Sequence, residues 1–249
     1  MKIRFLGTGT STGIPYIGCH CTVCQSDDSR DKRLRTSALI EEGDTRLLID
    51  CGPDFRQQAL REDITHIDAL LCTHEHYDHI GGLDDIRPLG DCHIYAEERV
   101  LASIKRCMPY CFGTNRYPGV PTMELHPVLP GKVFQVKNLN ILPIRAMHAQ
   151  LPILGYRIKN VAYLTDVKTL SENSIQQLAD LDVLVINALR QTPHPSHLSL
   201  SEACELAVRI NAKQTYFTHF THSLGLHRVV SETLPENIHM AYDGLAIEV

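Results

Sequence analysis

The chain has 249 residues, of which 43% are hydrophobic, and a formal net charge of −5 at pH 7. A chain of this length and apolar content can bury a sizeable core, so we predict a single domain over residues 1–249. Charges of both signs are spread along the sequence without a polybasic tract, which argues against a dedicated nucleic-acid or membrane-surface protein. There is no apolar signal segment and no long apolar stretch, so we expect a cytoplasmic protein without a membrane span.

Strand and helix patterns are distributed unevenly along the chain. Strands are predicted at 2–6, 36–42, 45–50, 67–73, 92–96, 133–136, 139–144, 153–158, 161–165, 182–187, 214–218, 238–242 and 245–249, and helices at 54–62, 97–107, 171–180, 199–211 and 226–234. The first half is rich in strands joined by short turns, and the second half alternates strand and helix. Two sheets back to back with helices outside cover both patterns, which predicts an α+β sandwich with four αββα layers.

The least regular stretch is 108–131, which is rich in proline and glycine. A long irregular segment inside a compact domain is usually functional or disordered. The sequence leaves two interpretations open: a lid over the functional site, or a solvated connection.

A dense group of polar side chains lies at 73–79, Thr-His-Glu-His-Tyr-Asp-His. His74 and His76 lie on one face if the segment is extended; Asp78 would continue that face and His79 would turn away from it. The group follows an apolar run of strand length and precedes two glycines, so it is predicted where a buried strand opens into a loop. Imidazole suits zinc and carboxylate suits harder ions, which favours two adjacent cations over a histidine-rich surface loop.

Three further donors come one at a time, each near the end of a predicted strand. They are His148, Asp166 and His219. A lone histidine is more often a satisfied core or surface residue than a ligand. Three such donors in a chain that already contains the 73–79 group favour the metal interpretation.

Cysteines are concentrated in the run Cys19-His20-Cys21-Thr22-Val23-Cys24. In a cytosolic chain this spacing is typical of metal binding rather than of disulfides. The other cysteines are scattered and are interpreted as small buried hydrophobic residues.

Together these motifs resemble the metallo-β-lactamase fold superfamily. The resemblance includes the opening Phe5-Leu6-Gly7-Thr8-Gly9-Thr10, the turn Leu48-Ile49-Asp50-Cys51-Gly52, the 73–79 group and the three later donors in family order. It implies two mixed β-sheets flanked by helices. It also implies one metal on His74, His76 and His148, a second on Asp78, His79 and His219, and a bridge between them through Asp166. Asp50 is then either a partner that orients a histidine or a turn former.

The cysteine run, together with His222, is similar to the extra zinc site of the phosphoribosyl 1,2-cyclic phosphodiesterases of bacterial phosphonate catabolism. The resemblance implies a structural zinc loop around 18–24, with Cys19, Cys21, Cys24 and His222 as the four ligands. Three thiolates and one imidazole leave no open position on tetrahedral zinc. The ion would hold the N-terminal loop against the loop of His219, with His20 exposed and uninvolved.

The stretch from His194 to His197 matches the family's His-Pro-x-His motif, which implies a substrate-contacting histidine at His197, with His194 the weaker candidate. Ser199 and Glu202 have the spacing of a capping box, so a helix is predicted to begin just after His197. Arg190 and Tyr77 are further candidates for the same pocket.

The expected chemistry is hydrolysis of a small cyclic phosphate, with phosphoribosyl 1,2-cyclic phosphate as the substrate implied by the resemblance. Two metals (zinc or manganese, or else iron) would activate a bridging water for attack on phosphorus. His197, Asp78 and Asp166 are the predicted catalytic residues, and His197 would protonate the leaving alkoxide.

The alternatives are another phosphoesterase, acting on cyclic nucleotides or RNA 3′ ends, and a carrier like the quinone-cofactor biosynthesis B-type proteins. The expected partner is a small phosphorylated sugar or nucleotide rather than a nucleic acid, and a homodimer stays open.

Overall fold

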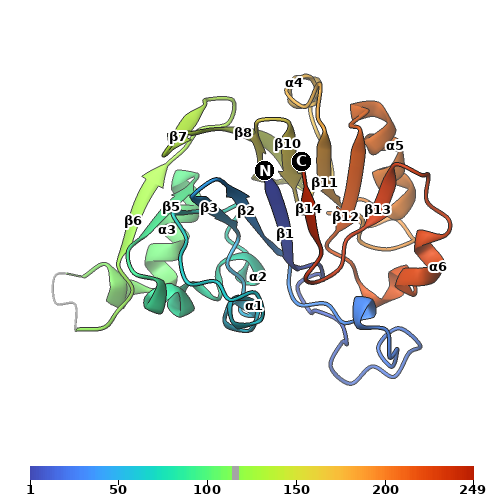
Figure 1. Ribbon diagram of the computed structural model, residues 1–249, viewed down its shortest axis with the longest axis horizontal. Helices are drawn as coiled ribbons and strands as arrows, with labels where there is room; N and C mark the ends of the chain where they lie inside the picture. The colour runs from blue at the N-terminus through green and yellow to red at the C-terminus, as the bar shows by residue number, and fades with distance from the viewer. Residues whose placement is uncertain (114–117) are drawn as a thin grey trace.

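The computed structural model describes residues 1–113 and 118–249, and within them the strands form two sheets of seven (Figure 1). The first sheet has the order β14 (Ala246–Glu248), β1 (Lys2–Gly7), β2 (Ser37–Glu42), β3 (Thr45–Ile49), β4 (Ala69–Leu71), β5 (Cys92–Ala96) and β6 (Met123–Pro127). The second has the order β13 (Ile238–Met240), β12 (Gln214–Thr218), β11 (Val183–Asn187), β10 (Val161–Leu164), β9 (Leu151–Ile158), β8 (Leu139–His148) and β7 (Phe134–Val136).

Both sheets are mixed. In the first, β1 and β2 are antiparallel whereas β3, β4 and β5 are parallel neighbours. In the second, β8 and β9 form a long antiparallel hairpin and β10 to β13 are parallel.

The helices connect the strands. The α-helices are α1 (Phe55–Arg61), α2 (Tyr77–Ile80), α3 (Glu98–Cys107), α4 (Glu172–Gln176), α5 (Leu200–Ile210) and α6 (His227–Ser231). The 3₁₀ turns are η1 (Ser29–Asp31), η2 (Leu83–Leu89), η3 (Pro109–Cys111) and η4 (His222–Leu224). None of the helices in the described ranges has the length and apolar content to cross a membrane.

Three apolar layers confirm the expected αββα order. Ile3 and Phe5 of β1 pack with Tyr156 and Tyr163 of the second sheet, which places this core between the sheets. A second core joins the other face of the first sheet to α1 and α3, and a third joins the second sheet to α5. Because strand side chains alternate between faces, each central strand contributes to two cores.

Several elements differ from the sequence prediction. Segment 108–131 is not a continuous irregular loop, because it contains η3 and the edge strand β6. The part of the proposed lid at 114–117 lies outside the described residues. The expected strands 139–144 and 153–158 extend toward each other to His148 and Leu151, because they pair in one hairpin. The capping box at Ser199 is confirmed, and α5 begins at Leu200.

Candidate metal centre

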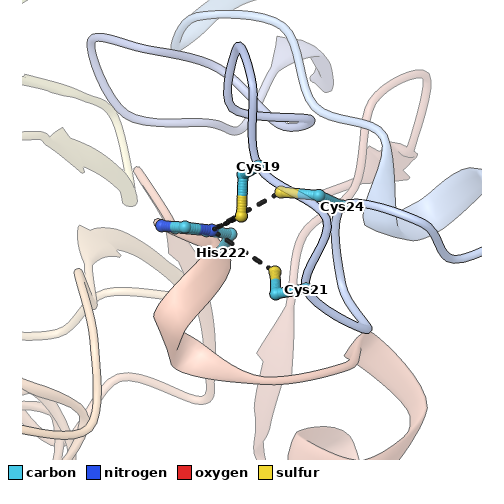
Figure 2. A group of neighbouring side chains, drawn as sticks. All are labelled: Cys19, Cys21, Cys24 and His222. Carbon is cyan, nitrogen blue, oxygen red and sulfur yellow. Dashed lines mark hydrogen bonds between the residues drawn. The ribbon is translucent and has the colours of Figure 1, made fainter.

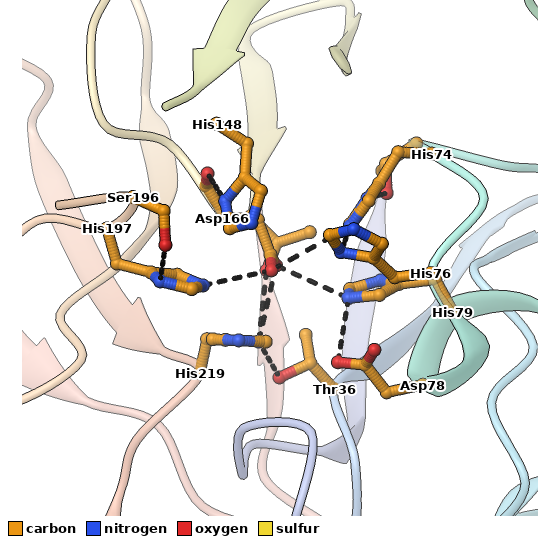
Figure 3. Close-up of polar contacts among 12 residues, drawn as sticks. Thr36, His74, His76, Asp78, His79, His148, Asp166, Ser196, His197 and His219 are labelled. Atoms are coloured by element: carbon orange, nitrogen blue, oxygen red, sulfur yellow. Dashed lines mark hydrogen bonds and ion pairs between the residues drawn. The ribbon is translucent and has the colours of Figure 1, made fainter. Parts of the chain in front are cut away.

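The functional residues predicted from the sequence gather at one end of the sandwich, because they follow the ends of strands from both sheets. His74 and His76 come after β4, while His148 is the last residue of β8. Asp166 comes two residues after β10, and His219 directly after β12. Parallel strands end at the same edge of a sheet, so side chains distant in sequence meet there (Figure 3).

The 73–79 group is not extended throughout, contrary to the sequence prediction. Helix α2 begins at Tyr77, immediately after His76, and Asp78 and His79 lie within its single turn. Asp78 therefore does not continue the face of His74 and His76, because a helix rotates each successive side chain around its axis.

Two glycines allow α2 to lie against the turn after β3. A Cβ atom on Gly52 would be 2.1 Å from the carbonyl oxygen of Asp78, and one on Gly82 would be 2.0 Å from that of Gly52. The contact is closed by a backbone hydrogen bond of 2.7 Å from Cys51 N to His79 O. A side chain at either glycine would push Asp78 and His79 out of the site.

Three site residues have left-handed backbone conformations. Asp50, Asp166 and His219 have φ values of 58°, 60° and 62°. Non-glycine residues rarely adopt this region, and such outliers cluster at functional sites. Each of the three residues lies just beyond the end of a buried strand, so the unusual turn aims its side chain across the end of the sandwich.

Hydrogen bonds fix which ring nitrogen three of the histidines present to the centre. The Nδ1 atom of His79 is 2.7 Å from Asp50 Oδ2, and that of His148 is 2.9 Å from the carbonyl oxygen of Asp166. Nδ1 of His74 is 3.0 Å from Thr73 Oγ1. The three Nε2 atoms are thereby directed to the interior, and His74 Nε2 lies 3.0 Å from His76 Nδ1.

The Asp166 carboxylate lies in the middle of this arrangement (Figure 3). Oδ1 is 3.4 Å from His79 Nε2 and 3.3 Å from His219 Nδ1. Oδ2 is 3.9 Å from His74 Nε2 and 3.1 Å from His197 Nε2. One carboxylate therefore faces members of both ligand sets that the resemblance implies: His74 in one, and His79 and His219 in the other.

Burial and charge oppose each other in the cluster. Burial alone would raise the pKa of Asp166, but the electrostatic interactions with the His219 and His79 rings, which are protonated where this carboxyl titrates, hold that pKa well below its usual range. Burial alone would lower the pKa of His79, but the carboxylates of Asp166, Asp78 and Asp50 raise it well above its usual value. Burial lowers the pKa of His74 and His148, and lowers that of His219 to about 4. The last three imidazoles are therefore neutral near pH 7, which is the form that binds metals.

The donor set fits divalent cations. His79 Nε2 is buried without a hydrogen-bond partner and points at two carboxylates, Asp78 at 3.1 Å and Asp166 at 3.4 Å. Ligand atoms of Asp78, His79, Asp166 and His219 all lie within 4.8 Å of one another, as do those of His148, Asp166 and His197. Buried carboxylates in excess of cationic side chains require compensation, which a metal ion supplies.

A second group of donors joins the N-terminal loop to η4. The thiols of Cys19, Cys21 and Cys24 lie 3.2, 3.4 and 3.4 Å from His222 Nδ1 (Figure 2). Zinc bonds of ordinary length at tetrahedral angles place sulfur and nitrogen about 3.5 Å apart, so the four atoms fit one zinc ion. The Cys24 amide lowers the pKa of the Cys21 thiol to about 6, and burial raises that of Cys24 to about 11. As predicted, His20 is exposed and outside the group.

A pocket of 330 Å³ lies between the two groups. His197 and His222 are both in its wall, together with Thr10, Arg190 and Ser223. Tyr77 was another candidate for this wall, but its side chain is 71% exposed on α2. A larger hollow of 550 Å³ between α1 and η2 is lined by none of the predicted site residues, so the smaller pocket is the relevant one.

Several hydroxyl groups support the site and were missed by the sequence analysis. Thr36 Oγ1 lies 3.1 Å from His219 Nδ1, and Thr165 Oγ1 donates to Asp166 Oδ1 at 2.7 Å. Ser196 Oγ lies 3.0 Å from His197 Nδ1. For Thr165 and Ser196, the only signal in the sequence is that each directly precedes a predicted site residue.

Comparison with known proteins gives consistent results. Residues 45–220 match the family described as the beta-lactamase superfamily domain. The crystal structure of a diphosphatase from the PhnP family superposes with a TM-score of 0.93 at 39% identity, covering 100% of this chain and 97% of that chain. The Zn²⁺-bound PqqB from Methylobacterium extorquens superposes with a TM-score of 0.83 at 19% identity, covering 100% of both chains. The second likeness shows the fold alone.

The sequence relatives include a protein with a different name. An octanoyltransferase of Porphyromonas gingivalis is 47% identical over 250 residues, a match that covers 98% of this chain and 51% of that protein. The chain thus spans about half the length of this relative, whose name describes the whole protein. Taken with the fold and the donor clusters, the matches show that the chain belongs to the beta-lactamase superfamily and has a metallo-β-lactamase fold close to that of the PhnP-family structure.

Proposed function

We propose that the protein is a binuclear metal-dependent phosphodiesterase that opens a small cyclic phosphate, with phosphoribosyl 1,2-cyclic phosphate as the foremost candidate. The observation that carries the proposal is the position of Asp166, whose two oxygens face two sets of inward-directed donors. His74, His76 and His148 would hold one metal, Asp78, His79 and His219 would hold a second, and Asp166 would contribute to both. The donor chemistry suits zinc or manganese, and also iron.

When bound, the metals would supply an activated water and would polarise the phosphate oxygens. The protein's own residues orient this centre. Asp50 holds the His79 ring, Thr73 contacts the His74 ring, and the carbonyl of Asp166 holds His148. Imidazoles fixed in this way need little reorganisation when charge develops on the substrate.

The adjoining pocket suits a compact anionic substrate. The Arg190 guanidinium is held by the carbonyls of Thr192 and Pro193, and it lines the pocket with the hydroxyl groups of Thr10 and Ser223. A guanidinium and hydroxyl groups are suitable partners for a phosphorylated sugar. The volume of 330 Å³ is that of a small-molecule site.

His197 lies between the metal centre and the pocket. Its Nε2 is 3.1 Å from Asp166 Oδ2, and its ring also lines the pocket. Its Nδ1 is 3.0 Å from Ser196 Oγ and 3.2 Å from His194 Nδ1, which fixes the ring. A sugar alkoxide is a poor leaving group, so a proton delivered from Nε2 would assist its departure.

The test is turnover by metal-loaded protein on a set of substrates: phosphoribosyl 1,2-cyclic phosphate, a 2′,3′-cyclic nucleotide and an aryl phosphodiester. Preferential turnover of the first supports the full proposal. Preferential turnover of the nucleotide leaves a phosphodiesterase and refutes the sugar substrate. No turnover of any of the three at confirmed full metal occupancy refutes the phosphodiesterase and favours another substrate class or a carrier.

A diphosphate ester is the second candidate substrate class. The favouring observation is the 39% identical structural relative, which is described as a diphosphatase. The same pair of metals suits attack on a phosphoanhydride, and the leaving phosphate then needs less help from a proton donor. A diphosphate ester added to the substrate set decides between the two classes.

A further inference from the structure

A third cluster of metal-binding side chains lies away from the catalytic centre and the cysteine group. It comprises His93 on β5 with Glu124 and His126 on the neighbouring strand β6. Neither strand is irregular, and their parallel register pairs His93 with Glu124 and Tyr95 with His126. Strand pairing alone therefore brings together three donors that are up to 33 residues apart.

The three side chains share one face of the sheet. On β5, Cys92, Ile94 and Ala96 face the helices. His93 and Tyr95 consequently face the other sheet, as do Glu124 and His126 on β6. This face is only partly covered at the edge of the sandwich, where the exposed side-chain fractions are 44% for His93, 28% for His126 and 66% for Glu124. An ion from solvent can reach the cluster directly.

The distances between donor atoms are those of ligands that share one ion. His93 Nδ1 is 3.0 Å from His126 Nε2 and 3.4 Å from Glu124 Oε2, and His126 Nε2 is 3.5 Å from the other carboxylate oxygen, Oε1. Bonds of ordinary zinc length separated by 90° to 110° place donor atoms about 2.9 to 3.4 Å apart. Little movement is needed to bind a cation.

Aromatic rings fix one of the ligands. The His126 ring stacks on Tyr95 with 4.5 Å between centroids, and Tyr95 stacks on Phe134 of β7 at 4.9 Å. The three stacked rings of His126, Tyr95 and Phe134 therefore extend from the first sheet to the second. An imidazole held in this way loses less conformational freedom when it binds an ion.

We propose that His93, Glu124 and His126 form a separate binding site for a divalent transition-metal ion of the zinc class. Two imidazoles and a carboxylate select zinc, copper or nickel over magnesium, which prefers oxygen ligands. Water would complete the coordination on the solvent side. The bound ion would hold edge strand β6 to β5 at the rim between the sheets.

The test is equilibrium dialysis of purified protein against Zn²⁺, followed by metal analysis, for the wild type and for His93→Asn and Glu124→Gln. Both variants change exposed side chains and should fold. The wild type is expected to bind one more zinc ion per chain than His93→Asn. Affinity at this site should fall more than about tenfold, since even partners of metal ligands contribute that much.

His239→Asn is the matched control. His239 lies on β13 and its ring contacts Tyr216 with 5.0 Å between centroids, as His126 contacts Tyr95, but it belongs to none of the donor groups in the described ranges. This variant should retain wild-type zinc stoichiometry. The proposal is overturned if His93→Asn and Glu124→Gln bind as much zinc as the wild type with equal affinity. It is also overturned if Mg²⁺ competes as well as Zn²⁺.

Discussion

The histidine–aspartate cluster (His74, His76, Asp78, His79, His148, Asp166 and His219) and the cysteine cluster (Cys19, Cys21, Cys24 and His222) differ in burial, in donor chemistry and in their attachment to the fold. Asp166, His79 and His219 are at most 2% exposed; Asp166 and His219 follow strand ends, and His79 lies in helix α2. Cys19 is half-buried and Cys21 is exposed, on a loop without regular structure of its own. The two clusters are joined through the short segment from His219 to His222, since each contributes one of these histidines.

This difference agrees with the proposed roles, in which one cluster carries the chemistry and the other holds the structure. Three thiols around one imidazole match the four positions of tetrahedral zinc and leave none for substrate. The other cluster instead combines imidazoles with carboxylates next to a pocket, which leaves room for water and a phosphate. Substitutions in the two clusters should therefore change different observables.

The largest effect is expected for Asp166→Asn. The amide keeps the size of the side chain but removes the charge shared by both metal sets. Loss of several kcal/mol of transition-state stabilisation lowers kcat about 10⁴-fold. Steady-state turnover, measured alongside metal content, checks this prediction. Asp182→Asn, at a half-buried surface aspartate paired with Lys213, is the control and should retain turnover. A wild-type kcat in Asp166→Asn would contradict the proposal that Asp166 is shared by the two metals.

His197→Ala should distinguish proton donation from metal binding. With a sugar alkoxide as the leaving group, kcat should fall about 10²- to 10⁴-fold. With an aryl leaving group, which needs no proton, the loss should be small, and both metals should stay bound. Turnover of the two substrates by the same preparation provides the measurement. Equal losses on both substrates would assign His197 to the metal centre instead.

Asp50→Asn should weaken metal binding without removing a ligand. The amide cannot accept the His79 hydrogen bond as strongly, so metal affinity should fall about 10- to 100-fold. Competition with a chelating dye measures this affinity. Asp180→Asn is the matched control, because Asp180 has a similar φ of 57° but is exposed. Equal affinities in the two variants would show that Asp50 only forms the turn.

The smallest effect on turnover, and the largest on stability, is expected for Cys24→Ser. Loss of the structural zinc should lower the free energy of unfolding by at least about 3 kcal/mol. The kcat of the folded fraction should fall less than about tenfold, since the catalytic donors remain. Urea unfolding and turnover are compared with Cys107→Ser, at an exposed cysteine outside the clusters. If Cys24→Ser lost as much kcat as Asp166→Asn, the proposed separation of a structural cluster from a catalytic cluster would be wrong.

The sequence predicted the residues of the candidate site better than it predicted how the backbone brings them together. His74, His76, Asp78 and His79 are adjacent in the chain, so spacing alone revealed them. The positions of His148, Asp166 and His219 at predicted strand ends favoured their joining the same site. Their assignment to two metals came only through the resemblance, because it depends on which strands end at the same edge. The left-handed conformations of Asp50, Asp166 and His219 have no local signal, since the surrounding structure imposes them.

Strand β6 shows the same limit in the fold. Pro127 and the prolines before it concealed a short edge strand whose existence depends on pairing with β5. Without β6, nothing in the sequence brings His126 to His93. The cluster between them therefore became visible only when the register of the two strands was known.

The most direct test of the central claim is phosphorus NMR of ring opening in ¹⁸O-labelled water, with phosphoribosyl 1,2-cyclic phosphate and manganese-loaded protein. The account predicts that a single ¹⁸O enters the phosphomonoester product, because the water attacks phosphorus. It also predicts that Asp166→Asn is inactive on the same timescale. Ring opening with the label in the sugar hydroxyl, or no ring opening by fully loaded protein, would contradict the account.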